Sequence, residues 1–186
     1  GGIGVVVVII MFGSILCIKY GNINVNIILL CVLFLAIVSL FDDLYGVKPI
    51  VRFVSHIFVS YIAIETVDGF AQNELILTKY QTIIYTIFIV YYINAYNFMD
   101  GVNGLASMQA ITTGIGTCII IAINYDNRDN MVFILNILIT AAFLGFLPYN
   151  FPKALMFLGD VGSTSTGFII AVLMIWASLI YGIELL

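Results

Sequence analysis

The chain has 186 residues and a mean hydropathy of +1.19; 63% of its residues are hydrophobic and only 9% are charged. A soluble domain is about a quarter charged, so this composition excludes a soluble globule, and the high apolar content excludes a disordered chain. The net charge of −4, with six basic residues scattered along the chain, argues against a nucleic-acid partner, which demands a basic patch. What remains is a polytopic membrane protein.

Seven apolar stretches approach the length of about 20 residues that a helix needs to span a bilayer. In chain order they cover residues 3–20, 25–41, 50–67, 80–94, 105–123, 131–147 and 163–185. The fourth is short unless its helix continues past Asn94. We therefore predict an all-α transmembrane helix bundle of about seven spans, embedded in the lipid bilayer.

The connectors between these stretches alternate between two sides of the membrane. One side collects residues 1–2, 42–48, 94–103 and 148–163, which contain dense strings of Gly, Asn and Asp. The other side collects residues 19–24, 68–79 and 125–130, which are ordinary hydrophilic turns. Three basic residues fall near each side, so the positive-inside rule does not orient the chain. Polar strings gathered on one side predict a single active site there.

The first string places Asp42 and Asp43 where an apolar run ends, with Lys48 shortly after. Adjacent carboxylates repel each other unless they share a cation, so the pair suits Mg²⁺ binding or proton acceptance. The alternative is a hydrated helix end, which is disfavoured because the C-terminal end of a helix repels negative charge.

The second string repeats polar side chains at every third position: Asn94, Asn97, Asp100 and Asn103. A helix end or a 3₁₀ turn would align them on one side. Their oxygens suit a hard cation, and their amides suit a nucleobase or a sugar. The alternative is a polar cap and turn between two spans.

The third string isolates Asp160 between apolar runs, flanked by Gly159 and Gly162. Ser163 is the predicted N-cap of the last helix. A helix N-terminus is a natural seat for phosphate, and a neighbouring carboxylate suits the accompanying Mg²⁺. The alternative is that Asp160 is only the capping residue.

Two polar residues in the third apolar stretch complete the set of candidates. His56, the only histidine, is expected to be an interhelical hydrogen bonder rather than a catalytic base. Arg52 either faces a lipid phosphate or snorkels to the interface.

In order and spacing the three strings resemble the motifs of the polyprenyl-phosphate N-acetylhexosamine-1-phosphate transferases, the family that includes the phospho-MurNAc-pentapeptide translocases. The matching segments are Gly1-Gly2-Ile3 for a glycine motif, Phe41-Asp42-Asp43 with Arg52-Phe53 for a paired-aspartate motif, residues 94–101 for an NxxNxxDG loop and residues 157–163 for a GDxGS loop. The residues at positions 97–100 and 150–152 resemble those of the branch that starts O-antigen and related surface polysaccharides more than those of the peptidoglycan translocases.

The resemblance implies Mg²⁺-dependent transfer of a sugar-1-phosphate from a UDP-N-acetylhexosamine to undecaprenyl phosphate, with release of UMP; Mn²⁺ is the alternative metal. It implies catalytic roles for Asp42, Asp43, Asp100 and Asp160, metal contacts at Asn97 and Asp160, and substrate contacts at Asn94, Asn97, Asn103, Lys48, Gly162 and Ser163. Because UDP-sugars are cytosolic, the motif loops would face the cytoplasm from a bacterial inner membrane. A homodimer is compatible with such an enzyme.

The sequence also departs from the family pattern. Asn103 stands where many members have Asp, and Lys48-Pro49 stands where a Ser-Ala pair is common. The family has further helices on both sides of this region and a His-containing loop near its C-terminal end. We therefore expect residues 1–186 to be one integral-membrane transferase domain without those parts. The alternatives are a phospho-MurNAc-pentapeptide translocase, a secondary transporter, and a non-catalytic truncated membrane subunit.

Overall fold

The structure, a computed structural model, describes residues 1–70, 77–124 and 131–181. Its helices are α1 (Gly2–Tyr20), α2 (Ile23–Tyr45), α3 (Pro49–Phe70), α4 (Lys79–Met99), α5 (Leu105–Asn124), α6 (Met131–Asn150) and α7 (Gly159–Tyr181). These described ranges contain no strand, and all seven helices are long and apolar enough to cross a membrane. The prediction of an all-α bundle with seven spans is confirmed; residues 182–185 of the last predicted span lie outside the described residues.

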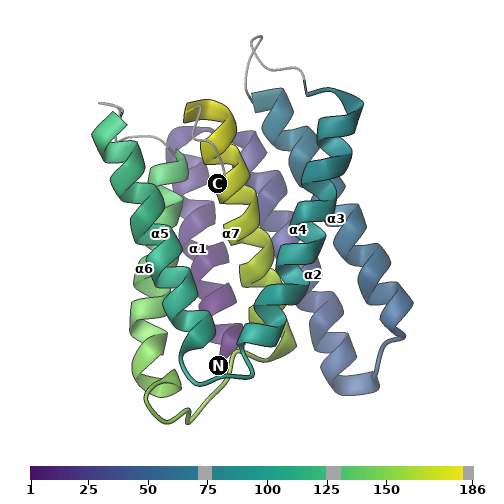
Figure 1. The fold of residues 1–186 in the computed structure, drawn as a ribbon, viewed down its shortest axis with the longest axis vertical. Helices are drawn as coiled ribbons and strands as arrows, with labels where there is room; N and C mark the ends of the chain where they lie inside the picture. Colours follow the sequence, from purple (N-terminus) through teal and green to yellow (C-terminus); the bar gives the residue numbers. More distant parts are fainter. Residues whose placement is uncertain (71–76, 125–130, 182–186) are drawn as a thin grey trace.

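The helices run up and down through the bundle, as the alternating connectors predicted. Figure 1 shows α2, α4 and α6 ending at the lower end of the molecule, where α3, α5 and α7 begin. The start of α1 lies at the same end. The three polar strings are therefore on one side, and this end of the bundle is called the motif end below.

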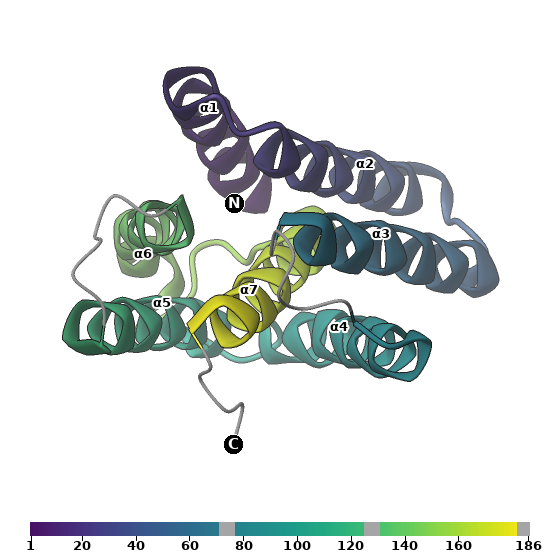
Figure 2. The same ribbon diagram turned by 90° about the horizontal axis from the view of Figure 1, so that it is seen from above.

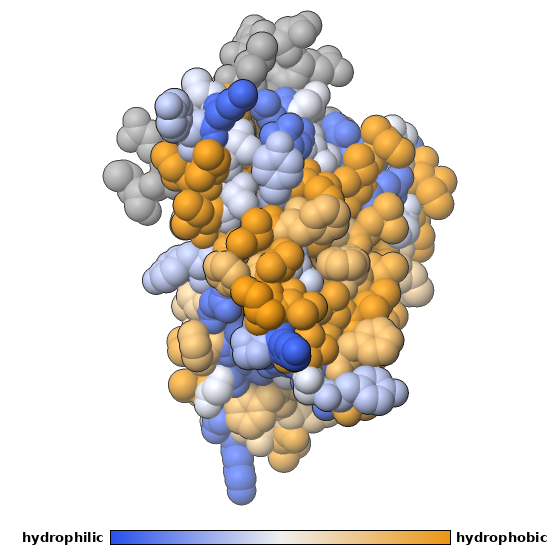
Figure 3. Space-filling model, turned by 90° about the vertical axis from the view of Figure 1, so that its right-hand side faces the viewer, coloured by the Kyte–Doolittle hydropathy of each residue, from blue (hydrophilic) through white to orange (hydrophobic). Residues whose placement is uncertain are grey.

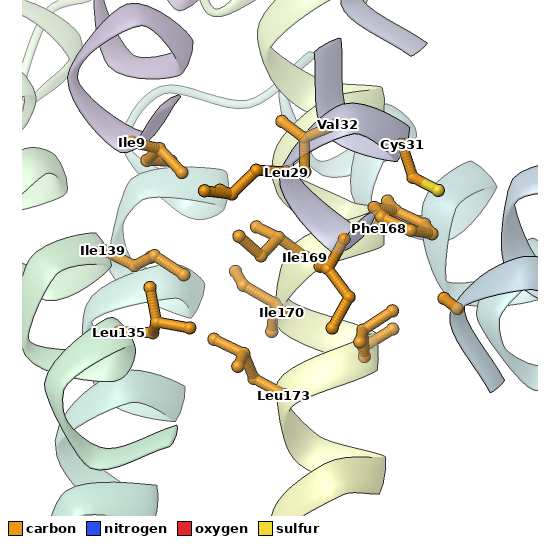
Figure 4. Close-up of a cluster of buried hydrophobic side chains, with 14 of the residues drawn as sticks. Ile9, Leu29, Cys31, Val32, Leu135, Ile139, Phe168, Ile169, Ile170 and Leu173 are labelled. Atoms are coloured by element: carbon orange, nitrogen blue, oxygen red, sulfur yellow. The ribbon is translucent and has the colours of Figure 1, made fainter. Parts of the chain in front are cut away.

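Helix α7 is the centre of the bundle. In its most apolar stretch 78% of the residues are buried, against 33–44% in the other six helices. Figure 2 shows α7 between α1 and α2 on one side and α4 and α5 on the other. Figure 4 shows how its side chains fill the core, with Phe168, Ile169, Ile170 and Leu173 of α7 among Ile9 of α1, Leu29, Cys31 and Val32 of α2, and Leu135 and Ile139 of α6.

The outer surface is apolar over much of its area. Figure 3 views the molecule from the right-hand side of Figure 1 and shows hydrophobic side chains covering much of that face. Large apolar residues such as Phe53 and Phe58 of α3 and Ile87 of α4 are about half exposed or more. Such a surface is stable against lipid and unstable in water, which agrees with the composition.

Local capping sets where several helices start and end. The Asn22 side chain accepts hydrogen bonds at the start of α2, and Thr78 and Gln81 form a capping box at the start of α4. Pro49 occupies the first position of α3, where its missing N–H costs nothing. Gly46, with φ of 70°, adopts the left-handed conformation that ends α2.

Four helices extend beyond their apolar runs at the motif end. Helix α2 continues to Tyr45, α4 to Met99 and α6 to Asn150, and α7 begins at Gly159 rather than near Ser163. An apolar run marks the part of a helix that faces lipid, whereas backbone hydrogen bonds continue while polar side chains find partners. The motif residues are consequently held on helix ends.

Candidate active site

An arginine joins two of the predicted site residues across three helices. The Arg52 guanidinium, on α3, lies 2.6 Å from Asp42 Oδ2 of α2 through Nη1 and 3.1 Å from Asp160 Oδ2 of α7 through Nη2. The Arg52 side chain is 31% exposed and that of Asp160 is 29% exposed. Solvent and ligands can therefore reach this charged cluster, which we call the Arg52 cluster (Asp42, Arg52 and Asp160).

Asp42 also organises the turn that follows α2. Its backbone carbonyl accepts the Gly46 N–H at 2.8 Å, and its Oδ1 accepts the Val47 N–H at 2.7 Å. These contacts and Arg52 compensate the carboxylate, which explains why a negative charge is tolerated at the C-terminal end of a helix. Asp42 is therefore both a structural residue and a member of the cluster.

Asp43 is the more accessible member of the aspartate pair. It is exposed, whereas the Asp42 side chain is only 12% exposed. The carboxylates of Asp160 and Asp42 repel Asp43, and Arg52 attracts it. An exposed carboxylate beside two others is suited to accept a proton or to approach a bound cation.

Asp160 lies in the first turn of α7, where the helix N-terminus favours negative charge. Its Oδ1 accepts a hydrogen bond from Asn97 Nδ2 of α4 at 3.2 Å. The structure thus brings together the two residues predicted as metal contacts.

The Asn97–Asp160 pair fits a small oxygen-binding cation. A 180° rotation of the Asn97 amide replaces Nδ2 by Oδ1, an exchange that depends only on the hydrogen-bond network. Two adjacent oxygens of an octahedral Mg²⁺ site at about 2.1 Å from the metal lie about 3.0 Å apart, close to the 3.2 Å separation here. Within the described ranges no three His, Cys, Asp or Glu residues form a metal-binding group. Such a site would need further oxygens from water or from a substrate phosphate, as Mg²⁺ sites commonly do.

Asp100 holds the start of α7 in place. Its Oδ1 accepts the Leu158 N–H at 3.0 Å and its Oδ2 accepts the Gly159 N–H at 2.8 Å. Burial raises the pKa of the Asp100 carboxyl, and these two N–H groups act in the opposite direction. Since both oxygens are engaged, Asp100 positions the turn that carries Asp160; its predicted catalytic role remains a prediction.

Three other residues that were predicted to contact the substrate have exposed side chains. Asn94 donates to the Val90 carbonyl of its own helix at 2.7 Å, and Asn103 donates to the Pro152 carbonyl at 3.2 Å. Lys48 lies exposed between α2 and α3. The contacts of these three residues do not include the Arg52 cluster among the described residues, and their substrate contacts remain predictions.

Gly162 and Ser163 are buried inside α7. The Ser163 hydroxyl donates to the Gly159 carbonyl at 2.9 Å, so the prediction that Ser163 is the N-cap is wrong. The helix starts earlier because Asp100 satisfies its first N–H groups from outside. Gly162 lies against Gly2 of α1, and a Cβ atom on Gly162 would overlap the backbone of Gly2. Their predicted substrate contacts remain predictions.

Asn150 is a structural residue that the candidate set did not include. It is 1% exposed, and its Oδ1 accepts from Gly104 N at 3.1 Å and from Ser107 Oγ at 2.9 Å. Its Nδ2 donates to the Met156 carbonyl at 3.0 Å. One amide thus joins the end of α6 to both loops that carry site residues. An isolated Asn after a long apolar run was the only signal in the sequence.

Two hollows adjoin the Arg52 cluster. One, of about 460 Å³, is lined by Asn97, Phe98, Asp100, Gly101 and Phe157. The other, of about 510 Å³, is a wholly apolar groove between α3 and α4. Its lining residues are Phe53, Ile57, Tyr61, Ile83, Thr86, Ile87, Val90 and Tyr91. Phe53, the next residue after Arg52 in the chain, is the α3 lining residue closest to the start of that helix.

Comparisons with known proteins identify the family of the chain. The sequence profile of glycosyl transferase family 4 matches residues 25–178, which include all three polar strings. The chain is 28% identical over 150 residues to the decaprenyl-phosphate N-acetylglucosaminephosphotransferase of Mycobacterium leprae, covering 72% of this chain and 37% of the relative. It is 36% identical over 110 residues to the phospho-N-acetylmuramoyl-pentapeptide-transferase of Streptococcus mutans, covering 54% and 32%. The corresponding enzyme of Enterococcus faecalis is 32% identical over 124 residues, with 64% and 38% covered.

The matches span about a third of the length of these relatives, from 32% to 38%. Within that region the family profile covers most of the chain, from α2 through α7. The resemblance drawn from the polar strings is confirmed: the chain belongs to glycosyl transferase family 4.

Proposed function

We propose that this protein transfers a sugar-1-phosphate from a UDP-N-acetylhexosamine to undecaprenyl phosphate, releasing UMP. In this reaction an oxygen of the lipid phosphate attacks the β-phosphorus of the UDP-sugar. The bond from that phosphorus to the bridging oxygen breaks, and UMP leaves with the oxygen. The observation that carries the proposal is the Arg52 cluster, where one cation and two carboxylates meet at the motif end of the bundle.

The α3–α4 groove supports a polyprenyl-phosphate acceptor. Its lining exposes no polar surface, which suits an isoprenoid chain. Phe53 lines the groove and is the neighbour of Arg52 in the chain, so a phosphate at the motif end of a bound isoprenoid would lie within the same turn of α3 as the guanidinium. Arginine binds phosphate oxygens through its planar fork of donors. The accessible Asp43 would accept a proton from that phosphate.

The smaller hollow supports a nucleotide-sugar donor. Phe98 and Phe157 offer aromatic faces of the kind on which bases stack, and Asn97 offers amide hydrogen bonds. Asn97 also contacts Asp160, so a nucleotide there would present its diphosphate to the cluster. Asp160 and Asn97 would hold Mg²⁺, with Mn²⁺ as a substitute. The metal would neutralise charge on the two reacting phosphates.

The pentapeptide translocase reaction is the second candidate, because the matches to such enzymes have the higher identities, 32% and 36%. It uses the same cluster, groove and metal, with a larger sugar on the donor. Family membership does not favour the transporter alternative, which requires acidic residues near the middle of the membrane. A cytosolic UDP-sugar would place the motif end on the cytoplasmic side of a bacterial inner membrane.

The test uses membranes that carry the protein in its natural length, supplied with UDP-GlcNAc, undecaprenyl phosphate and Mg²⁺. We expect UMP release that stops when the metal is chelated. Asp160→Asn keeps the shape of the side chain and removes its charge, so release should fall by about a hundredfold or more. Glu65→Gln, the same chemical change toward the other end of α3, is the matched control and should release UMP normally. Full turnover in Asp160→Asn would refute the metal assignment.

A further inference from the structure

His56 is a buried polar residue to which the proposed reaction assigns no role. It lies on α3, is 3% exposed, and its Nδ1 has no hydrogen-bond partner among the described residues. The expectation that it hydrogen-bonds across helices is therefore not met at this atom. A buried polar atom without a partner costs free energy, because it has lost its hydrogen bonds to water. A polar side chain kept inside a membrane bundle at that cost is a functional candidate.

The position of His56 relates it to Arg52. The two residues are four apart on α3, so they lie one above the other on the same face. Side chains on a helix lean toward its N-terminus, which places the His56 imidazole over the turn that carries Arg52. Arg52 and Asp160 both act electrostatically on His56. The buried imidazole therefore lies next to the Arg52 cluster, one turn deeper in the bundle than Arg52.

The rest of this face of α3 shows that a polar residue is not needed for packing. Val59, Ala63, Ile64 and Val67 are all buried and apolar. Ser60, one turn farther from Arg52 than His56, is buried and its hydroxyl also lacks a partner among the described residues. An apolar side chain at position 56 would fill the same space without an unpaired nitrogen.

The Arg52 guanidinium has more N–H donors than its two carboxylate partners engage, and the His56 imidazole has a nitrogen that can accept one of them. Arg52 Nη1 donates to Asp42, and its Nη2 lies 3.1 Å from Asp160 Oδ2, while a guanidinium has five N–H donors. A phosphate at the end of the groove competes with Asp42 and Asp160 for this fork. Any donor released in that exchange needs an acceptor nearby, and a guanidinium without one regains its rotamer freedom. In an imidazole protonated on Nε2, Nδ1 is such an acceptor.

We propose that His56 is a positioning residue that keeps the Arg52 guanidinium at the end of the α3–α4 groove, so that it sets the affinity for the lipid phosphate. The inference rests on the proposed function, since it deepens the acceptor half of that site. His56 acts through Arg52 and does not itself touch the substrate.

The experiment compares four variants of the protein in its natural length. His56→Leu fills the space without hydrogen bonding, and His56→Met is its more adaptable replacement should the leucine variant fail to accumulate. His56→Asn and His56→Gln keep a hydrogen-bonding group. Two readouts are taken: the KM and kcat of UMP release with varied undecaprenyl phosphate, and direct calorimetric binding of farnesyl phosphate to detergent-solubilised protein without nucleotide sugar.

We expect the apolar variants to raise the acceptor KM and the farnesyl phosphate Kd about tenfold, with kcat within about threefold of wild type. At least one amide variant should restore both constants to within about threefold. Ser60→Ala, which removes the other unpartnered group on this face, should change neither. Equal binding by His56→Leu and wild type would overturn the inference, as would failure of both amides to restore it. If wild type binds farnesyl phosphate with this His56 dependence but releases no UMP, the proposed reaction fails while the role of His56 stands.

Discussion

Replacing Asn150 by leucine removes the amide that joins three segments near the site. The leucine keeps the size of the side chain, so the change is confined to hydrogen bonding. It leaves the Gly104 N–H, the Ser107 hydroxyl and the Met156 carbonyl without their partner. Gly104 and Ser107 are buried, so water cannot easily replace the amide there. Each lost partner costs about 1 kcal/mol or more, and the sum is about 3 kcal/mol.

The measurement is the free energy of unfolding in detergent, followed together with UMP release. Asn150→Leu should unfold about 3 kcal/mol more easily. Its UMP release should fall by at least about tenfold where the protein is still folded, because small displacements of the loops misplace reacting groups. Both loops carry residues of the proposed site.

Asn136→Leu in the same helix is the matched control. Asn136 is also buried, but within the described residues its amide donates to the Val132 carbonyl one turn earlier on α6, a contact inside one helix. The same substitution there should cost about 1 kcal/mol or less and leave UMP release intact. Equal unfolding free energies for Asn150→Leu and wild type would refute the reasoning, as would an equally large loss in Asn136→Leu.

Two further predictions concern packing and sidedness. Gly162→Ala places a methyl group into the backbone of α1 at Gly2 and should destabilise the protein by about 1–3 kcal/mol in thermal or denaturant unfolding. Gly116→Ala, where a Cβ meets no other atom within 4 Å, should be neutral or stabilising; a larger loss there than in Gly162→Ala would contradict the packing argument. In a background without the three free cysteines, single cysteines at Tyr45 and Tyr20 should react with an impermeant thiol reagent from opposite sides of the membrane. Labelling of both from one side would contradict the arrangement of the helices.

The bundle and its sidedness follow from the sequence because both depend on local properties. Hydrophobicity and length decide which segments span a membrane, and strict alternation then decides which connectors share a side. Asp42, Asp100 and Asp160 could be placed at one end of the bundle by this argument alone. The apolar runs predicted helix ends several residues too short at the motif end. Hydrophobicity marks where lipid contact stops, whereas a helix ends where its backbone hydrogen bonding stops.

The roles of individual polar residues depend on partners that are distant in the chain. The sequence pattern treats Asp100 and Asp160 alike, yet both oxygens of Asp100 hold the backbone at the start of α7 while Asp160 faces Arg52 and Asn97. Ser163 fits the capping pattern but is buried, because Asp100 caps α7 from another segment. A side chain's chemistry is set by the groups that face it, and those groups are chosen by packing.

The low content of charge, 9% of the residues, by itself determines that this protein lies in a membrane. The seven apolar stretches determine the number of spans, and their alternation determines the end that carries the motifs. The polar strings carry the resemblance to the family, which the family profile confirms. Only the tertiary structure decides that Arg52 joins Asp42 to Asp160 and that His56 Nδ1 is buried with no partner in the part of the chain that the structure describes. The physical reason is that hydrophobicity acts segment by segment, whereas an ion pair between three helices exists only once those helices have packed.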